Sequence, residues 1–74
     1  MGKLSPEEAY KLLGKAIIET VEEFPDGVIE STIFMAFETR GIPFDATKKL
    51  VDELIDVRIL ERKHNMLFIH PSRL

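Results

Sequence analysis

Apolar side chains recur at intervals of three and four residues from position 10 to position 24, which is the spacing of one face of a helix. The members of this stripe are Tyr10, Leu13, Ile17, Val21 and Phe24. Further apolar residues widen it, namely Leu12, Ala16 and Ile18. The pattern predicts a first helix that is buried on more than a narrow face.

The boundaries of this first helix are also written in the sequence. Ser5-Pro6-Glu7-Glu8 predicts its start, because serine can cap a helix, proline suits the first helical position and Glu8 completes a capping box. Pro25-Asp26-Gly27 predicts a turn that ends it. We expect the helix to lie between these two signals.

A helix-turn-helix is predicted next. Val28-Ile29 is too short to stand alone and is expected to add a small strand to a sheet edge. Glu30 or Ser31 opens the next helix, with Ser31 as a cap. Its inward residues are Ile33, Phe34 and Phe37. Gly41 fits a left-handed helix cap, Ile42 its apolar partner, and Pro43 blocks helix continuation.

The third helix is predicted to begin with Asp45 as its cap. Its inward positions are Ala46, Leu50, Leu54 and Val57, with Val51 and Ile55 beside them. Its exposed positions are Thr47, Lys48, Lys49, Asp52, Glu53 and Asp56. Residues 59–62 and 66–70 then read as two strands joined by a turn at 63–65, in which Asn65 is the candidate for a positive φ.

The order helix, strand, helix, helix, strand, strand predicts an α+β fold of the winged-helix type, a helix-turn-helix followed by a two-stranded ribbon called the wing. The whole chain, residues 1–74, is expected to be one domain. It contains no cysteine, and no apolar run approaches the roughly 18 residues of a membrane span. With no signal-peptide pattern at its start, we expect an intracellular protein of the cytoplasm or nucleoid that does not contact membranes.

Charge is divided unevenly along the chain, whose net charge is −3. Residues 1–38 carry eight acids and three bases, whereas residues 39–74 carry five acids and seven bases. An anionic partner is therefore expected to bind the C-terminal half. The candidate nucleic-acid-binding residues are Lys48, Lys49, Arg58, Arg62, Lys63 and His64.

The wing holds most of these candidates. Arg62, Lys63 and His64 are expected at its tip and Arg58 at its base, with only Glu61 opposing them locally. Such a cluster can hold phosphates without reading bases, although cations on an edge strand also discourage sheet-to-sheet association. About three phosphate contacts imply weak, salt-sensitive binding.

The third helix is a poor base reader. Counting Asp45, its predicted outer face carries four acids and two lysines, with no arginine, asparagine or glutamine to pair with a base edge. Sequence-specific recognition of DNA is therefore disfavoured. The acidic first helix and the mixed third helix also suit a basic or amphipathic protein segment, so protein binding is the competing interpretation.

A family resemblance rests on the runs Gly27-Val28-Ile29, Gly41-Ile42, Leu50 with Leu54, residues 58–62, and Met66-Leu67-Phe68. The chain resembles the C-terminal winged helix of archaeal-type minichromosome maintenance helicases. The C-terminal winged helix of the middle subunit of replication protein A is the second resemblance. Arg58 departs from the pattern, because many winged helices place glycine between the third helix and the wing.

The resemblance implies a non-catalytic accessory domain of a DNA-replication protein, one that modulates a helicase or contacts DNA weakly through the wing. The alternatives are a protein-interaction winged helix and a small transcription regulator. Catalytic, metal and cofactor sites are not expected, because the serines suit caps and His64 and His70 lie near no carboxylate cluster at ligand spacing. No small-molecule ligand is expected; the partners are DNA or a replication protein.

Overall fold

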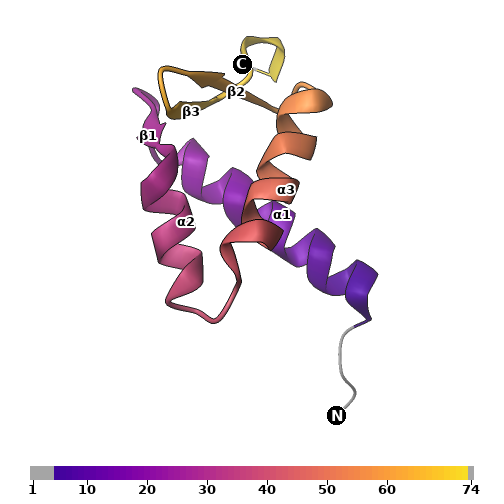
Figure 1. Ribbon diagram of the computed structural model, residues 1–74. Coiled ribbons are helices and arrows are strands. Elements are labelled where there is room, and N and C mark those ends of the chain that lie inside the picture. The colour runs from indigo at the N-terminus through magenta and orange to yellow at the C-terminus, as the bar shows by residue number, and fades with distance from the viewer. Residues whose placement is uncertain (1–4, 74) are drawn as a thin grey trace.

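The computed structural model describes residues 5–73 and has the element order that the sequence predicts. Its helices are α1 (Pro6–Glu22), α2 (Glu30–Glu38) and α3 (Phe44–Asp56). Its strands are β1 (Val28–Ile29), β2 (Leu60–Lys63) and β3 (Met66–Ile69), followed by the short 3₁₀ helix η1 (Pro71–Arg73). The chain is thus an α+β protein in which the sheet lies over one end of the helices (Figure 1).

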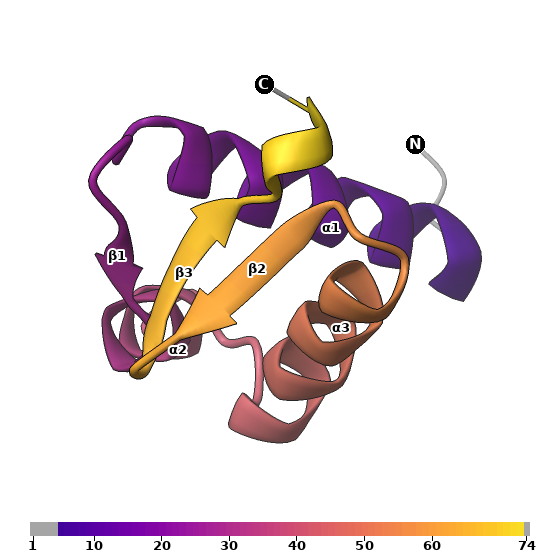
Figure 2. The same ribbon diagram turned by 90° about the horizontal axis from the view of Figure 1, so that it is seen from above.

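The sheet is antiparallel with the order β1-β3-β2, so the expected addition of a small strand to the edge of the hairpin is confirmed. Leu67 of the central strand is paired with Val28 on one side and with Arg62 on the other. Seen from above, α3 runs beside β2 while α1 passes behind the sheet (Figure 2). This arrangement is compatible with a winged-helix layout.

A single apolar cluster lies between the helices and the sheet. The helices α1, α2 and α3 contribute most of its residues, and each of the three strands adds one. The buried members are Ile17, Val21, Val28, Ile33, Phe37, Leu50, Val51, Leu54, Leu60 and Leu67. Gly14 of α1 is also buried and lies beside Leu50 of α3.

The buried face of α1 is narrower than predicted. Ile17 and Val21 are fully buried, as expected, but Leu12 is 54% exposed. Phe24 is 44% exposed because α1 ends at Glu22, so the helical phase no longer applies to it. The prediction of inward side chains at these two positions is wrong.

The buried face of α3 is rotated relative to the prediction. Thr47, expected to be exposed, is fully buried and its hydroxyl donates to the carbonyl of Pro43 at 3.4 Å. Val57, expected to point inward, is 61% exposed because it follows the last residue of the helix. The actual face is Thr47, Leu50, Val51 and Leu54.

The helix starts confirm one predicted cap and correct two. Ser5 and Glu8 form the capping box at the start of α1. The residue before α3 is Pro43, so Asp45 is not its cap but lies in the first turn, where its charge still suits the helix dipole. Ser31 is not a cap either, because α2 begins at Glu30, whose N–H donates to the carbonyl of Asn65 at 2.8 Å.

Two helices end in left-handed residues with the same pair of hydrogen bonds. Gly41 (φ 86°) ends α2 as predicted, and Ile42 N–H donates to the carbonyl of Phe37 at 3.0 Å. After α3 the left-handed residue is Arg58 (φ 63°), with Ile59 N–H donating to Leu54 at 2.9 Å. An arginine therefore occupies a conformation that favours glycine.

Arg58→Gly is expected to raise the free energy of unfolding by about 1 kcal/mol, because glycine adopts this backbone conformation without steric cost. Urea unfolding measures the change. Arg58→Ala is the control: it removes the same charge but keeps a Cβ atom, so it should bring no such gain. Equal stability of the two variants would contradict this prediction.

The hairpin turn contains two left-handed residues, His64 (φ 51°) and Asn65 (φ 66°). The positive φ predicted for Asn65 is confirmed. The positive φ of His64 was not predicted. Two consecutive positive φ values in a two-residue loop define the type I′ turn that suits the twist of a hairpin. The turn therefore fixes the register in which Lys63 faces Met66.

Candidate nucleic-acid interface

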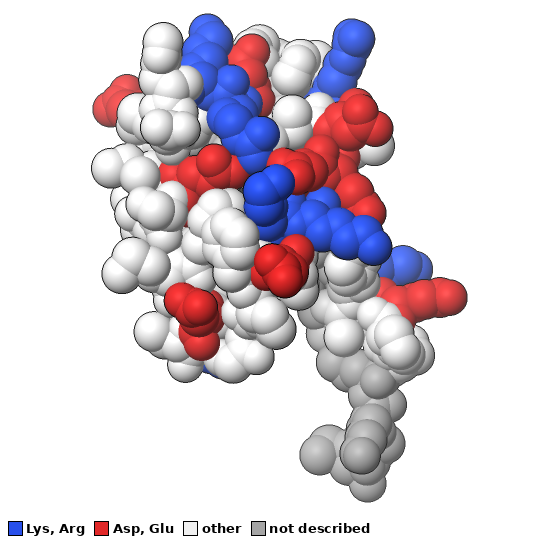
Figure 3. All heavy atoms as spheres, viewed as in Figure 1, with Lys and Arg blue, Asp and Glu red and all other residues white. Residues whose placement is uncertain are grey.

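The six candidate residues belong to α3, to the hairpin and to the segment between them. Lys48 and Lys49 belong to α3, Arg58 follows it, and Arg62, Lys63 and His64 lie at the end of β2 and in the turn. Basic and acidic side chains are intermixed over α3 and the hairpin, while the surface over α2 is mostly uncharged (Figure 3). Several carboxylates therefore lie among the basic side chains of α3 and the hairpin (Figure 3).

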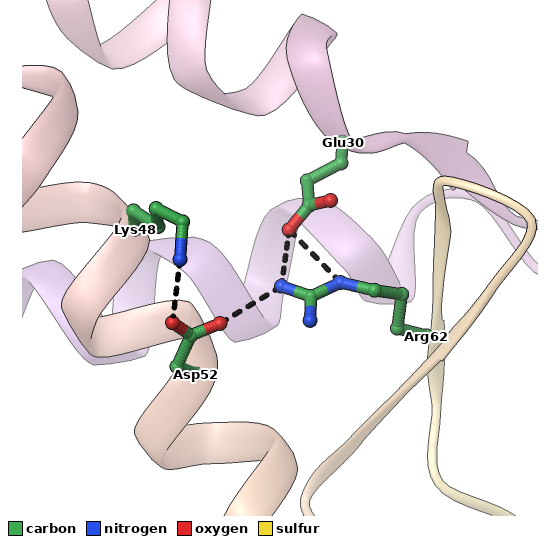
Figure 4. A network of polar contacts seen from close by, with 4 residues as sticks. All are labelled: Glu30, Lys48, Asp52 and Arg62. Atoms are coloured by element: carbon green, nitrogen blue, oxygen red, sulfur yellow. Dashed lines mark hydrogen bonds and ion pairs between the residues drawn. The ribbon is translucent and has the colours of Figure 1, made fainter.

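Arg62 is held within the molecule by two carboxylates. Its Nε donates to Oε2 of Glu30 at 3.2 Å, and its Nη2 donates to the same oxygen. Nη2 also donates to Oδ1 of Asp52 at 2.9 Å. The guanidinium thus links the hairpin to the first residue of α2 and the middle of α3 (Figure 4).

Lys48 extends the same network. Its Nζ donates to Oδ2 of Asp52 at 3.0 Å, so both oxygens of that carboxylate are bound by cations. The pKa of Asp52 is lowered, mainly by the hydrogen bond from Arg62 and to a smaller extent by the hydrogen bond from Lys48. The pKa of Arg62 is raised, mainly by its hydrogen bond to Glu30 and to a smaller extent by its hydrogen bond to Asp52. Two of the six candidate cations are therefore paired internally.

Glu61 is the one acid expected to oppose the wing cations locally, but Glu30 and Asp52 from two other elements oppose them as well. Arg62 lies two residues after buried Leu60, and alternate residues of a strand share a face. Its side chain therefore points toward the helices and not away from the sheet. Glu30, its partner, lies 32 residues away in the sequence, so local inspection could not identify the pair.

The other four candidates, Lys49, Arg58, Lys63 and His64, are exposed. Lys63 Nζ lies 3.9 Å from Oε1 of Glu61, and its side chain is 64% exposed, so this contact is loose. Among residues 5–73, no ion pair forms with Lys49, Arg58 or His64. Arg58 and His64 flank opposite ends of β2, so these cations are spread out and not clustered.

The outer face of α3 is a shallow groove with an excess of acid. It is lined by Asp45, Lys48, Lys49, Asp52, Glu53 and Asp56. Lys48 and Asp52 offset each other, which leaves three acids against Lys49. A phosphate backbone placed along this groove would meet net negative charge.

Apolar side chains are exposed on other faces. Met35 of α2 is 64% exposed, and Phe44 at the start of α3 is 43% exposed. The Phe44 ring packs edge-on against Phe34 with centroids 4.7 Å apart. A separate groove, of about 530 Å³, runs between the end of α1, the hairpin and η1, and Phe24 lines it. The sequence pattern had assigned Phe24 to the core and so gave no sign of this groove.

Comparison of the chain with family models, with curated proteins and with solved structures gives no match. Within residues 5–73, no helix has the length and apolar character needed to cross a membrane. The same part of the chain contains no group of three or more histidines and acids placed to hold a metal ion.

Proposed function

We propose that the chain is a winged-helix accessory domain that acts mainly by binding another protein. In this assignment α2 and α3 are the helix-turn-helix and β2–β3 is the wing. The observation that carries the proposal is the pairing of Arg62 with Glu30 and Asp52. The central cation of the wing is already neutralised by the protein itself, so it is not free for phosphate.

The electrostatics of α3 support the same conclusion. In a DNA-binding helix-turn-helix, the second helix lies in the major groove between two phosphate backbones. Here that helix presents Asp45, Glu53 and Asp56 on its open face. These charges repel phosphate, and no arginine or amide side chain on α3 is available to read a base. A role as a transcription regulator is disfavoured for this reason.

Exposed apolar and aromatic side chains support protein binding. Methionine and aromatic residues are enriched in protein interfaces, and Met35, Phe44 and Phe24 are all more than two-fifths exposed. The resemblance to the winged helices of replication proteins supports an accessory role in a protein of that kind, with modulation of a helicase as the expected effect.

Weak, non-specific contact with DNA is the second candidate function. It is favoured by the exposure of Lys49, Arg58, Lys63 and His64, none of which is hydrogen-bonded to a carboxylate of residues 5–73. With so few cations and no base contacts, the binding energy would come from counterion release alone.

A titration of fluorescent duplex DNA of about 20 base pairs tests the assignment. We expect a dissociation constant weaker than about 10⁻⁴ M at physiological salt, becoming detectable only at low salt. Lys63→Glu should weaken the low-salt binding further, whereas Glu38→Gln, at the far end of α2, should not. Micromolar, sequence-dependent affinity that survives high salt would contradict the proposal.

A further inference from the structure

The central strand β3 is covered along only half of one edge. Its neighbour β1 is two residues long and pairs with Met66 and Leu67 alone. Phe68 and Ile69 extend beyond the point where β1 begins. Among the described residues, 5–73, no strand therefore pairs with this edge of β3 at Phe68 and Ile69.

Strand alternation shows which backbone groups face the open edge. Asn65 accepts a hydrogen bond from Glu30 on the β1 side, so Leu67 and Ile69 direct their N–H and C=O to that side as well. His70 donates to Ile59 on the β2 side, so Phe68 faces β2. Ile69 is thus the residue whose backbone faces the open edge.

Within the part of the chain that the structure describes, Ile69 has no backbone partner at this edge. The position opposite it belongs to Asp26, but the chain there turns away, and the turn is closed by Gly27 N–H donating to Phe24 at 2.8 Å. An uncovered strand edge can accept another strand, because its donors and acceptors gain partners.

The open edge lies in the groove of about 530 Å³, which is lined by apolar residues from three segments. Val21, Phe24 and Pro25 come from the end of α1 and the turn after it, Phe68 and Ile69 from β3, and Pro71 from η1. The Phe68 ring lies directly on Gly27, in space that a side chain at position 27 would occupy. The groove therefore combines apolar walls with unpaired backbone groups.

The groove is also lined by charged residues of both signs, among them Glu22 and Arg73. Glu22 lies at the C-terminus of α1, whose last turn contains no base, and the helix dipole adds to its negative charge. Arg73 lies on η1, and neither residue forms an ion pair among residues 5–73. Lys63 and Glu61, which also line the groove, lie 3.9 Å apart and offset each other.

We propose that this groove binds an extended segment of a partner protein, which continues β1 and pairs its backbone with Ile69. An apolar side chain of the segment packs between Phe24 and Phe68, a basic residue faces Glu22, and an acidic residue faces Arg73. This inference rests on the proposed protein-binding function and identifies its surface and the chemistry of the partner.

Amide hydrogen exchange of the free protein tests the open edge. Ile69 is expected to exchange on the order of a hundredfold faster than Leu67 and Phe68, whose N–H groups are bound within the sheet. Comparable protection of all three amides would overturn the proposal, because the edge would then be closed.

Peptides selected from a phage-displayed library of random sequences, panned on the full chain, test the occupant. Selected peptides are expected to alternate apolar and polar residues, to carry both a basic and an acidic residue, and to slow exchange at Ile69. Phe24→Ser should weaken their binding about tenfold or more. Met35→Ser, which removes an even more exposed apolar side chain on α2, should leave it unchanged.

Backbone methylation of the peptide residue opposite Ile69 should abolish binding, because it removes the donated hydrogen bond. If Met35→Ser weakened peptide binding and Phe24→Ser did not, the groove would not be the binding site, although protein binding at another surface would be supported. A library that yields no binder would overturn the groove as well. The proposed protein-binding function itself would be contradicted only if the library yielded no binder and the chain also bound duplex DNA tightly.

Discussion

Gly27→Ala is expected to lower the free energy of unfolding by about 2–5 kcal/mol, which is a large share of the stability of so small a domain. Two effects add. Gly27 has a φ of 98°, a conformation that a residue with a Cβ atom adopts at a cost of about 1–2 kcal/mol. A Cβ atom at this position would also lie 2.5 Å from the ring of Phe68, which must move.

Urea unfolding of Gly27→Ala beside Gly41→Ala separates these two effects. Gly41 has a similar φ of 86°, but an added Cβ would meet no atom within 4 Å. Gly41→Ala should therefore cost only about 1–2 kcal/mol. If both variants lose the same stability, the contact between Gly27 and the Phe68 ring is not as the structure describes it.

Arg62→Met is expected to cost about 1–2 kcal/mol. Glu30 is only 14% exposed at its side chain, so loss of the guanidinium leaves a carboxylate that water solvates incompletely. The estimate stays modest because the Arg62 side chain is 36% exposed and solvent screens part of the attraction. In a double-mutant cycle with Glu30→Gln, we expect a coupling energy of about 1 kcal/mol. A coupling energy of zero would contradict the network.

The pH dependence of the same variant gives a second readout. The pKa of Asp52 is lowered in the folded state, so the folded state binds this proton less readily than the unfolded chain does. The stabilisation is complete above the unfolded pKa of about 3.9 and is lost as the pH falls through the lower folded pKa. The stability gap between the wild type and Arg62→Met should therefore narrow below about pH 4; a constant gap would argue against this coupling.

The sequence predicts the elements well where the signals are local. The capping box at Ser5 and the left-handed cap at Gly41 depend on residues within a few positions of each other, and both are confirmed. The element order follows from the same kind of signal. Because backbone hydrogen bonds at helix ends are formed by near neighbours, such features can be predicted without knowing the tertiary structure.

The sequence fails where packing decides which face is buried. Thr47 was assigned to the surface because it is polar, yet it continues the buried positions 50, 51 and 54 at helical spacing. Val57 and Phe24 were assigned to the core because they are apolar, yet both lie just beyond the end of a helix. Hydrophobicity alone therefore predicts the helices correctly, but it misplaces the buried face of α3 and extends the buried stripes of α1 and α3 beyond the helix ends.

At the candidate site, the sequence shows which residues are charged but not which of them pair. The type and position of the wing cations were visible in the sequence, but the acids that neutralise Arg62 come from two other elements. The groove beside β3 was equally hidden, because it exists only where β1 is too short to cover its neighbour. Both features depend on residues that the fold brings together from distant segments.

One comparison of DNA affinities tests most directly the claim that internal pairing keeps the wing from DNA. The variant Glu30→Gln/Asp52→Asn removes the two carboxylates that bind Arg62. Its control, Glu7→Gln/Glu38→Gln, changes net charge equally at the end of the molecule away from the hairpin (Figure 1). In a low-salt titration with the same duplex, the first variant should bind about tenfold more tightly than the control. Equal affinities would contradict the claim, because net charge alone would then set the binding.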